Sequence, residues 1–156
     1  MNTTATKYPD ANAQDGLDLS GLRHILGHQL AMAEVPTRKT FFKHIGKPFD
    51  LRPAEFSMLV LIDHNTNVTQ KQLSQALAIP APNITTMLDR LAERGMLMRK
   101  RNQTDRRSIY VQLTEAGKKL KDQAYEISGT MERTLLRRLS LAERAMLLEL
   151  LQKVSL

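Results

Sequence analysis

Apolar residues in the first third of the chain recur every three to four positions, which is the spacing of one face of an α-helix. The first series begins after Asp18 and consists of Leu19, Leu22, Leu26, Leu30 and Ala33. Pro36 lacks an N–H, so we expect it to kink or interrupt this helix. Apolar positions resume at Phe41, and Gly46-Lys47-Pro48 is predicted to end the segment.

Three further helices follow with recognisable start and stop signals. The first begins at Pro53, a favourable first-turn residue, and ends before Asn65-Thr66-Asn67. The second is introduced by Thr69-Gln70-Lys71-Gln72, a capping box in which Thr69 and Gln72 satisfy free N–H groups. After a turn at Ile79-Pro80-Ala81-Pro82, the third spans 82–94 and is followed by glycine.

The pattern then changes from helix to strand and back to helix. Residues 97–101 and 108–113 are predicted strands, because apolar and polar residues alternate in the second of them, and a polar loop over 102–107 joins the two. Thr114 begins a helix predicted to reach Arg138, and Ser140 caps a last helix. That last helix is apolar around most of its circumference, so we infer that it forms a subunit interface.

Short helices followed by a hairpin indicate a mainly α fold with a small β-hairpin wing, that is, a winged helix-turn-helix. We assign residues 51–114 to this DNA-binding domain and the flanking helices, 17–50 and 115–156, to N- and C-terminal dimerisation segments. Residues 1–16 are polar and without periodicity, which is typical of a flexible tail.

Composition adds a preference for polyanionic partners. The chain of 156 residues carries a net charge of +7 and has no cysteine. The segment from Arg90 to Arg107 contains seven basic residues and two acidic ones. We find no apolar signal region and no run near the ~20 residues of a membrane span, and therefore expect a cytoplasmic protein. Without a Gly-rich phosphate loop, a Gly-x-Ser-x-Gly motif or a paired carboxylate site, we predict that it is not an enzyme and needs no cofactor.

The predicted helix-turn-helix has a polar outer face suited to DNA. On its second helix Asn83, Thr85 and Thr86 are able to bond base edges, and Arg90 to reach a phosphate. The hairpin beside it is basic, through Arg99, Lys100 and Arg101, and its loop ends in Asp105-Arg106-Arg107. An arginine there is placed to enter the minor groove, with Asp105 holding a neighbouring arginine by an ion pair.

Several segments together resemble the MarR family of bacterial and archaeal regulators. They are Leu51-Arg52-Pro53-Ala54-Glu55-Phe56, Thr69-Gln70-Lys71-Gln72-Leu73, Met87-Leu88-Asp89-Arg90-Leu91-Ala92-Glu93-Arg94-Gly95, and Asp105-Arg106-Arg107 followed by Leu113-Thr114-Glu115-Ala116-Gly117. The resemblance implies a homodimeric, ligand-responsive transcriptional regulator, with a repressor released by an effector as the usual mode. Its two winged helices would bind a near-palindromic DNA site.

Carried over by position, the resemblance implies a set of DNA-binding residues. They are Gln70, Lys71, Pro82, Asn83, Thr85, Thr86, Arg90, Arg99, Arg101, Asp105, Arg106 and Arg107. The chain departs from the family pattern at Pro80-Ala81-Pro82, where a capping Ser or Thr is usual, and at Thr86, where Arg is frequent. Base preference therefore does not transfer from relatives.

The resemblance also implies a small-molecule site lined by the first helix and the start of the second. The expected effector-binding residues are Arg23, His24, His28, Arg38, Lys39, Phe49 and Met58. Cations beside apolar residues suit an aromatic carboxylate or a coenzyme A thioester. Three alternatives stay open. The cations are solvated or contact DNA phosphates and bind no ligand, the protein is a metal-responsive regulator using His24 and His28, or it is a nonspecific winged-helix module that binds DNA or protein.

Overall fold

The computed structural model describes residues 17–101 and 109–155, and the chain divides into two compact units between Val35 and Pro36. In the first unit, η1 (Ser20–Leu22) is a short 3-10 helix, and α1 (Leu26–Phe41) begins after it. The side chain of Asp18 accepts hydrogen bonds from the backbone N–H (2.8 Å) and the hydroxyl (2.9 Å) of Ser20. These bonds start a separate turn, so the predicted continuous helix from Asp18 is wrong.

The boundary between the two units falls within α1, and helical backbone continues past Pro36 to Phe41. Of the two outcomes predicted for Pro36, a kink or an interruption, the interruption does not occur: the missing N–H removes one hydrogen bond, and the neighbouring turns persist. The π-helical turn η2 (Phe42–Gly46) and α2 (Lys47–Phe49) follow directly. Pro48 also fails to stop the segment, because it occupies the first turn of α2, where an N–H is not needed. The helical path ends at Asp50, which has a left-handed conformation (φ 49°).

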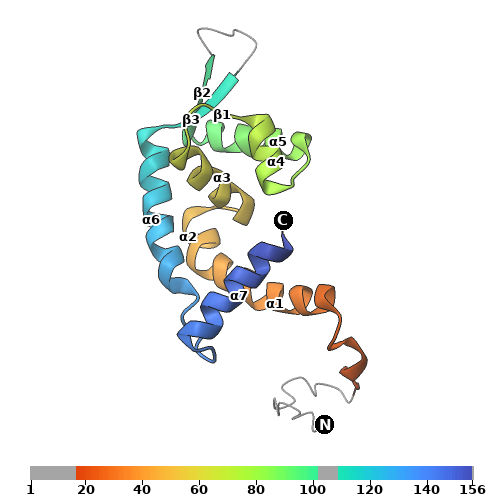
Figure 1. The fold of residues 1–156 in the computed structure, drawn as a ribbon. Coiled ribbons are helices and arrows are strands. Elements are labelled where there is room, and N and C mark those ends of the chain that lie inside the picture. Colours follow the sequence, from red (N-terminus) through yellow and green to blue (C-terminus); the bar gives the residue numbers. More distant parts are fainter. Residues whose placement is uncertain (1–16, 102–108, 156) are drawn as a thin grey trace. The chain divides into compact units, whose positions relative to one another are not determined.

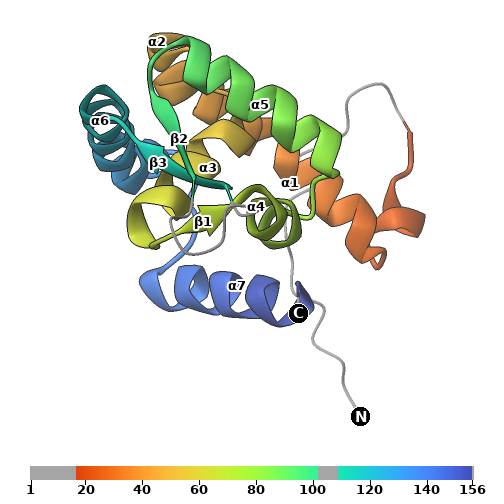
Figure 2. The same cartoon turned by 90° about the horizontal axis from the view of Figure 1, so that it is seen from above.

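The second unit contains the remaining elements, which are shown from two directions in Figures 1 and 2. They are α3 (Pro53–His64), β1 (Val68–Thr69), α4 (Gln70–Leu77), α5 (Ala81–Glu93), β2 (Leu97–Arg101), β3 (Ile109–Leu113), α6 (Glu115–Met131) and α7 (Leu141–Val154). The antiparallel sheet has the order β1-β3-β2, with Val111 of β3 opposite both Val68 and Arg99. The sequence did not predict β1, because two residues are too short to show alternation.

The core lies between α3, α4, α5 and the sheet. Its fully buried side chains include Met58, Leu59, Leu73, Ile84 and Leu91. Aliphatic residues dominate it, as expected for a chain with 4% aromatic residues. Helices α3, α4 and α5 each contribute one apolar face to this core, so the packing fixes α5 against the rest of the lobe.

The base of the hairpin is packed tightly against the start of α6. The Thr114 hydroxyl accepts a hydrogen bond from Gly117 N (3.0 Å) and donates one to the Gly95 carbonyl (2.6 Å). A Cβ at Gly117 would lie 2.0 Å from the Met96 carbonyl oxygen, so only glycine allows this approach. The hairpin therefore leaves the lobe in a fixed position.

Beyond Met131 the helix gives way to turns over residues 132–139, so the predicted extension of α6 to Arg138 is wrong. Arg144 of α7 donates to the carbonyls of Leu136 (2.8 Å) and Leu139 (3.2 Å). Carbonyls at a helix end need such partners, and these bonds stabilise the turn in place of further helix. Helix α7 starts at Leu141 and is capped by Ser140, as predicted.

Candidate nucleic-acid interface

Helices α4 and α5 form the helix-turn-helix, joined by a turn with a fixed backbone path. Ala78 adopts a left-handed conformation (φ 51°) at the end of α4. The N–H of Ile79 donates to the Ser74 carbonyl (3.1 Å), and the Ser74 hydroxyl donates to the Ile79 carbonyl (2.6 Å). Both polar groups of Ile79 are thus satisfied within the turn, which sets the angle between the two helices.

Gln70 holds the first turn of α5. Its side-chain amide donates to Thr85 Oγ1 (2.6 Å) and to the Ala81 carbonyl (3.3 Å). The Thr85 hydroxyl in turn donates to Ala81 (2.9 Å). Gln70 and Thr85, both predicted DNA contacts, therefore bond to each other and position α5 in this structure.

The outer face of α5 exposes short polar side chains. Pro82, Asn83 and Thr86 are all exposed, whereas Ile84 and Leu88 on the opposite face are 0% and 1% exposed. The Thr86 hydroxyl donates to the Pro82 carbonyl (3.1 Å), so its oxygen is still able to accept a hydrogen bond. Within the described residues the Asn83 amide has no hydrogen-bond partner, so both its donor and its acceptor are available to a base edge.

The strand β2 adds a row of exposed cations next to α5. Arg99 Nη2 bonds to Asp89 Oδ1 of α5 at 2.5 Å, joining the hairpin to the helix. Lys100 and Arg101 are exposed further along the strand. The predicted wing-tip residues Asp105, Arg106 and Arg107 lie outside the described residues. The structure thus assigns to Asp89 the kind of ion pair that we predicted for Asp105.

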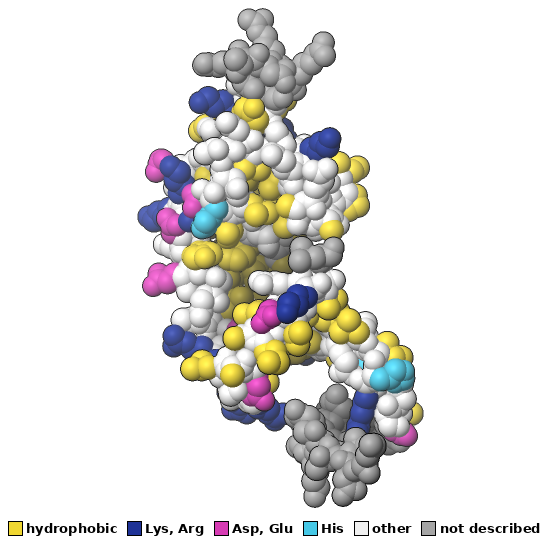
Figure 3. Space-filling view, in the orientation of Figure 1, with side chains coloured by type: hydrophobic (Ala, Val, Ile, Leu, Met, Phe, Trp, Pro, Cys, Tyr) yellow, Lys and Arg dark blue, Asp and Glu magenta, His cyan; other side chains and the backbone are white. Residues whose placement is uncertain are grey.

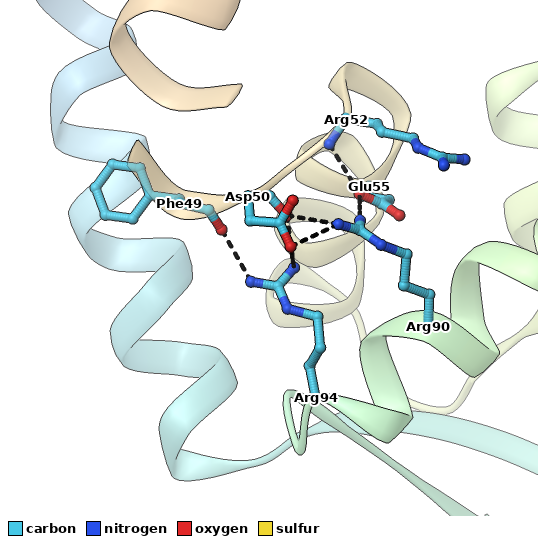
Figure 4. A network of polar contacts seen from close by, with 6 residues as sticks. All are labelled: Phe49, Asp50, Arg52, Glu55, Arg90 and Arg94. Carbon is cyan, nitrogen blue, oxygen red and sulfur yellow. Dashed lines mark hydrogen bonds and ion pairs between the residues drawn. The ribbon is translucent and has the colours of Figure 1, made fainter. Parts of the chain in front are cut away.

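A second polar network lies behind α5, at the start of α3 (Figure 4). Glu55 is 0% exposed, and its Oε2 accepts from Arg90 Nη1 (2.5 Å) and from the backbone N–H of Arg52 (2.8 Å). Arg90 Nη2 also pairs with Asp50 Oδ2 at 2.7 Å. The hydrogen bond to Glu55, followed by the charges of Glu55 and Asp50, raises the pKa of Arg90 above its usual value.

Arg94, one turn further along α5, bonds to the same corner of the backbone. It donates to the carbonyls of Asp50 (2.6 Å) and Phe49 (2.9 Å). The left-handed Asp50 turns these carbonyls toward α5 (Figure 4). The two arginines therefore fix α5 to the α2–α3 junction, and the guanidinium of Arg90, predicted to reach a DNA phosphate, is engaged inside the protein.

Comparison with known proteins gives one consistent result. Residues 51–109 match the model of the MarR family. The HTH-type transcriptional regulator MhqR of Bacillus subtilis is 32% identical over 114 residues, covering 73% of this chain and 78% of the relative. The chain belongs to the MarR family.

Solved structures of similar regulators agree with this assignment. The transcriptional repressor CouR, bound to a 23-mer DNA duplex, superposes with a TM-score of 0.83 at 33% identity, over 90% of this chain and 99% of that one. BpsR of Bordetella bronchiseptica, whose DNA binding is regulated by 6-hydroxynicotinic acid, superposes with a TM-score of 0.78 at 25% identity, covering 85% and 94% of the two chains. MarR-family members are transcriptional regulators, and a winged-helix fold, a double-stranded DNA partner and a non-enzymatic role are thereby confirmed for this chain.

The residues predicted for an effector are distributed over both units. Arg23, His24 and His28 belong to the first unit, where the two histidines stand four residues apart. In the second unit Arg38 and Lys39 are exposed and Phe49 is half-buried, but Met58 is 0% exposed and belongs to the core. Met58 thus has no surface to offer a ligand in this conformation.

Two further observations concern the alternatives. Over residues 17–101 and 109–155, no group of three His, Cys, Asp or Glu side chains is arranged to hold a metal ion. In the same residues, no helix has the length and apolar character needed to cross a membrane.

Sequence reasoning missed four residues of this interface: Asp50, Glu55, Asp89 and Arg94. A signal was present for Glu55, which stands at the third position of a helix that begins with Pro53. A carboxylate there ordinarily accepts from the preceding backbone N–H, and this one does. No local pattern pointed to its second partner, Arg90, because 35 residues separate the two in sequence.

Proposed function

We propose that this MarR-family regulator is a homodimeric repressor that binds a near-palindromic DNA site through α5 and the β2–β3 hairpin, and that a small organic effector releases it. The observation that carries the proposal is the outer face of α5. Asn83 and Thr86 are exposed on a helix whose opposite face is fully buried and whose first turn is held by Gln70. A rigid helix with short, unshielded polar side chains suits the major groove.

The dimer is supported by apolar surface that the second unit leaves uncovered. No side chain of α7 is buried, and Met146, Leu148 and Leu150 are 61%, 62% and 51% exposed. Figure 3 shows hydrophobic side chains at the surface along this helix. Soluble proteins rarely expose such a patch unless a partner covers it, and a second copy of the chain provides the same surface. We assign residues 17–50 and 115–156 to this interface and 51–114 to DNA binding.

Release by a small molecule is supported by the relatives and by the cations of the first helix. BpsR is regulated by an aromatic acid, 6-hydroxynicotinic acid. In the first unit, Arg23 and His24 are exposed basic residues next to α1. An aromatic carboxylate or its coenzyme A thioester offers the matching charge and apolar surface.

The test is fluorescence anisotropy on DNA from upstream of the protein's own gene and on scrambled DNA of equal length, across a salt series. We expect the first duplex to bind at least about 10³-fold more tightly at physiological salt, and aromatic acids or their thioesters to release it. Equal, salt-sensitive affinity for both duplexes would contradict the proposal and favour a nonspecific DNA-coating module.

A further inference from the structure

Helix α5 begins without a side-chain cap. Its N-cap residue is Pro80, whose side chain makes no capping hydrogen bond, and Pro82 in the first turn has no N–H to offer one. The N–H groups of Asn83 and Ile84 both donate to the Pro80 carbonyl, at 3.0 and 3.2 Å. A helix that lacks a capping side chain is less stable in its first turn. The first turn of α5, which carries the exposed Asn83, therefore depends on support from another element.

That support comes from Gln70, the first residue of α4. Its amide nitrogen donates to Thr85 Oγ1 (2.6 Å) and to the Ala81 carbonyl (3.3 Å). A carbonyl oxygen only accepts hydrogen bonds, so the nitrogen of the Gln70 amide, and not its oxygen, must face Ala81. The Thr85 hydroxyl donates to the same carbonyl (2.9 Å). These bonds join the first two turns of α5 to each other and to α4.

The number of donors on these two side chains limits what they can offer to DNA. A glutamine amide carries two N–H donors, and both acceptors of the Gln70 amide lie within the protein. The single donor of the Thr85 hydroxyl is also used. Phosphate oxygens need a donor from the protein, so neither side chain is able to bond to the DNA backbone in this arrangement. Gln70 and Thr85 are therefore suited to act on DNA through the position of α5.

The alignment of the first turn matters more for base recognition than for general attraction to DNA. Hydrogen bonds to a base edge weaken steeply as their distance and angle change. Attraction between basic side chains and phosphates depends mainly on charge and does not distinguish sequences. Without the bonds from Gln70, Asn83 would move more freely relative to the bases. We therefore expect affinity for one sequence to fall while nonspecific affinity stays the same.

We propose that Gln70 determines DNA specificity as a positioning residue: through Thr85 and Ala81 it aligns the first turn of α5, and Asn83 with it, without contacting DNA. This role rests on the proposed function, because it requires that α5 recognises a DNA sequence. The hydrogen-bonded unit of Gln70 and Thr85 requires no DNA, so the unit and the role are separable by experiment.

The first measurement compares Gln70→Ala with the wild type by fluorescence anisotropy over a salt series. One duplex is selected by the wild type from a random pool, and the other is scrambled. We expect binding to the selected duplex to weaken about tenfold, with less than about twofold change on the scrambled duplex and an unchanged salt dependence. Unchanged affinity for the selected duplex would overturn the proposal. So would equal losses on both duplexes with a weaker salt dependence, which is the result expected of a phosphate contact.

The matched control is Gln75→Ala. It removes the same side chain from an exposed position of the same helix. Both affinities should stay within about twofold of the wild type. A loss on the selected duplex equal to that of Gln70→Ala would mean that any shortened glutamine of α4 weakens binding, and would overturn the assignment to Gln70.

A double-variant cycle tests whether Gln70 acts through Thr85. Thr85→Val removes the hydroxyl and keeps a side chain of similar shape, so we expect it to weaken binding to the selected duplex about as much as Gln70→Ala. Thr85→Ser keeps the hydroxyl and should stay within about threefold of the wild type. The double variant Gln70→Ala/Thr85→Val should bind no more than about twofold more weakly than the weaker single variant. Losses that multiply in the double variant would show independent action and overturn the proposal.

Urea unfolding of the same variants without DNA separates this proposal from the proposed function. If Gln70 and Thr85 form one unit, the shifts in the urea midpoint of the two single variants do not add in the double variant. Additive shifts would overturn the unit itself. Shifts that are not additive, together with a wild type that binds both duplexes equally, would uphold the unit and refute sequence recognition, and with it the role of Gln70 in specificity.

Discussion

Helices α5 and α7 are both specified by local sequence signals, but they differ in how much of their apolar surface is buried. α5 has Ile84, Leu88 and Leu91 at 0%, 1% and 0% exposure, packed into the core of its own chain. α7 is capped by reciprocal bonds between Ser140 and Glu143, yet none of its side chains is buried. Capping and periodicity are sufficient to specify a helix, whereas burial requires a partner. One helix has that partner within the chain, and we propose that the other finds it in a second copy.

The largest effect is expected where α7 would meet its partner. Replacing Leu147 by Asp places a carboxylate in the proposed interface twice, once from each subunit. We predict that the dissociation constant of the dimer rises by more than about 10³-fold and that the variant is a folded monomer, measured by light scattering and circular dichroism. The control, Gln152→Asp, introduces the same charge at an exposed polar position of α7 and should stay dimeric. A stable Leu147→Asp dimer would refute the interface.

The contrast in burial is tested directly by truncating one leucine in each helix. Leu88→Ala should lower the free energy of unfolding by about 2–5 kcal/mol, because it leaves a cavity in a packed core. In the monomeric Leu147→Asp background, Leu148→Ala should cost less than about 0.5 kcal/mol, since that side chain is 62% exposed. Urea denaturation measures both values, and similar costs would show that α7 packs within its own chain.

The network behind α5 should contribute more than the ion pair beside it. Glu55→Gln removes a fully buried carboxylate from Arg90, and we expect a loss of about 2 kcal/mol in the free energy of unfolding. Asp89→Asn breaks the ion pair with Arg99. The side chains of Arg99 and Asp89 are 45% and 46% exposed, so we expect the free energy of unfolding to fall by less than about 1 kcal/mol. If chemical denaturation shows the opposite order, α5 is positioned mainly from the hairpin.

An effect of about 1 kcal/mol, which depends on pH, is expected at the link between α3 and α6. Lys121 is 7% exposed and bonds to Asp63 at 2.6 Å. This hydrogen bond lowers the pKa of Asp63 below its ordinary value of 3.8. A lowered carboxyl pKa stabilises the fold above the ordinary value, and that stabilisation is lost as the pH falls through the lowered pKa.

The free energy of unfolding of the wild type should therefore exceed that of Asp63→Asn by about 1 kcal/mol at pH 7, and this difference should shrink as the pH falls below 3.8 and through the lowered pKa. Thermal unfolding of both proteins from pH 7 to pH 2 measures this difference. A difference in the free energy of unfolding that persists at pH 2 would mean that the contribution of Asp63 to stability does not depend on its charge.

Much of this lobe could be predicted from local signals. The capping boxes at Thr69 and Ser140, the Pro53 start and the Gly95 stop each correspond to an element boundary in the structure. Two of the errors, the end of α6 and the missed strand β1, have determinants that lie elsewhere in the chain. α6 ends early because Arg144 of α7 bonds to the carbonyls after it, and β1 exists only because Val68 pairs with Val111.

In the candidate interface too, local signals could be predicted from the sequence and tertiary contacts could not. The exposed row on α5 follows from helical spacing, which the sequence displays, so Asn83 and Thr86 were found correctly as surface residues. That Gln70 bonds Thr85, and Arg90 bonds Glu55, depends on tertiary packing between helices. Residue type alone cannot separate an arginine that holds a helix from one that contacts a phosphate.

The most direct test of the central claim, that the outer face of α5 recognises bases, is the Asn83→Ala variant. Duplexes selected by the wild-type protein from a random pool and scrambled duplexes are titrated by fluorescence anisotropy at fixed salt. We predict a loss of about 1–3 kcal/mol on the selected DNA, unchanged affinity for scrambled DNA and an unchanged salt dependence. Unchanged affinity for the selected DNA, or an equal loss on both duplexes, would contradict the account.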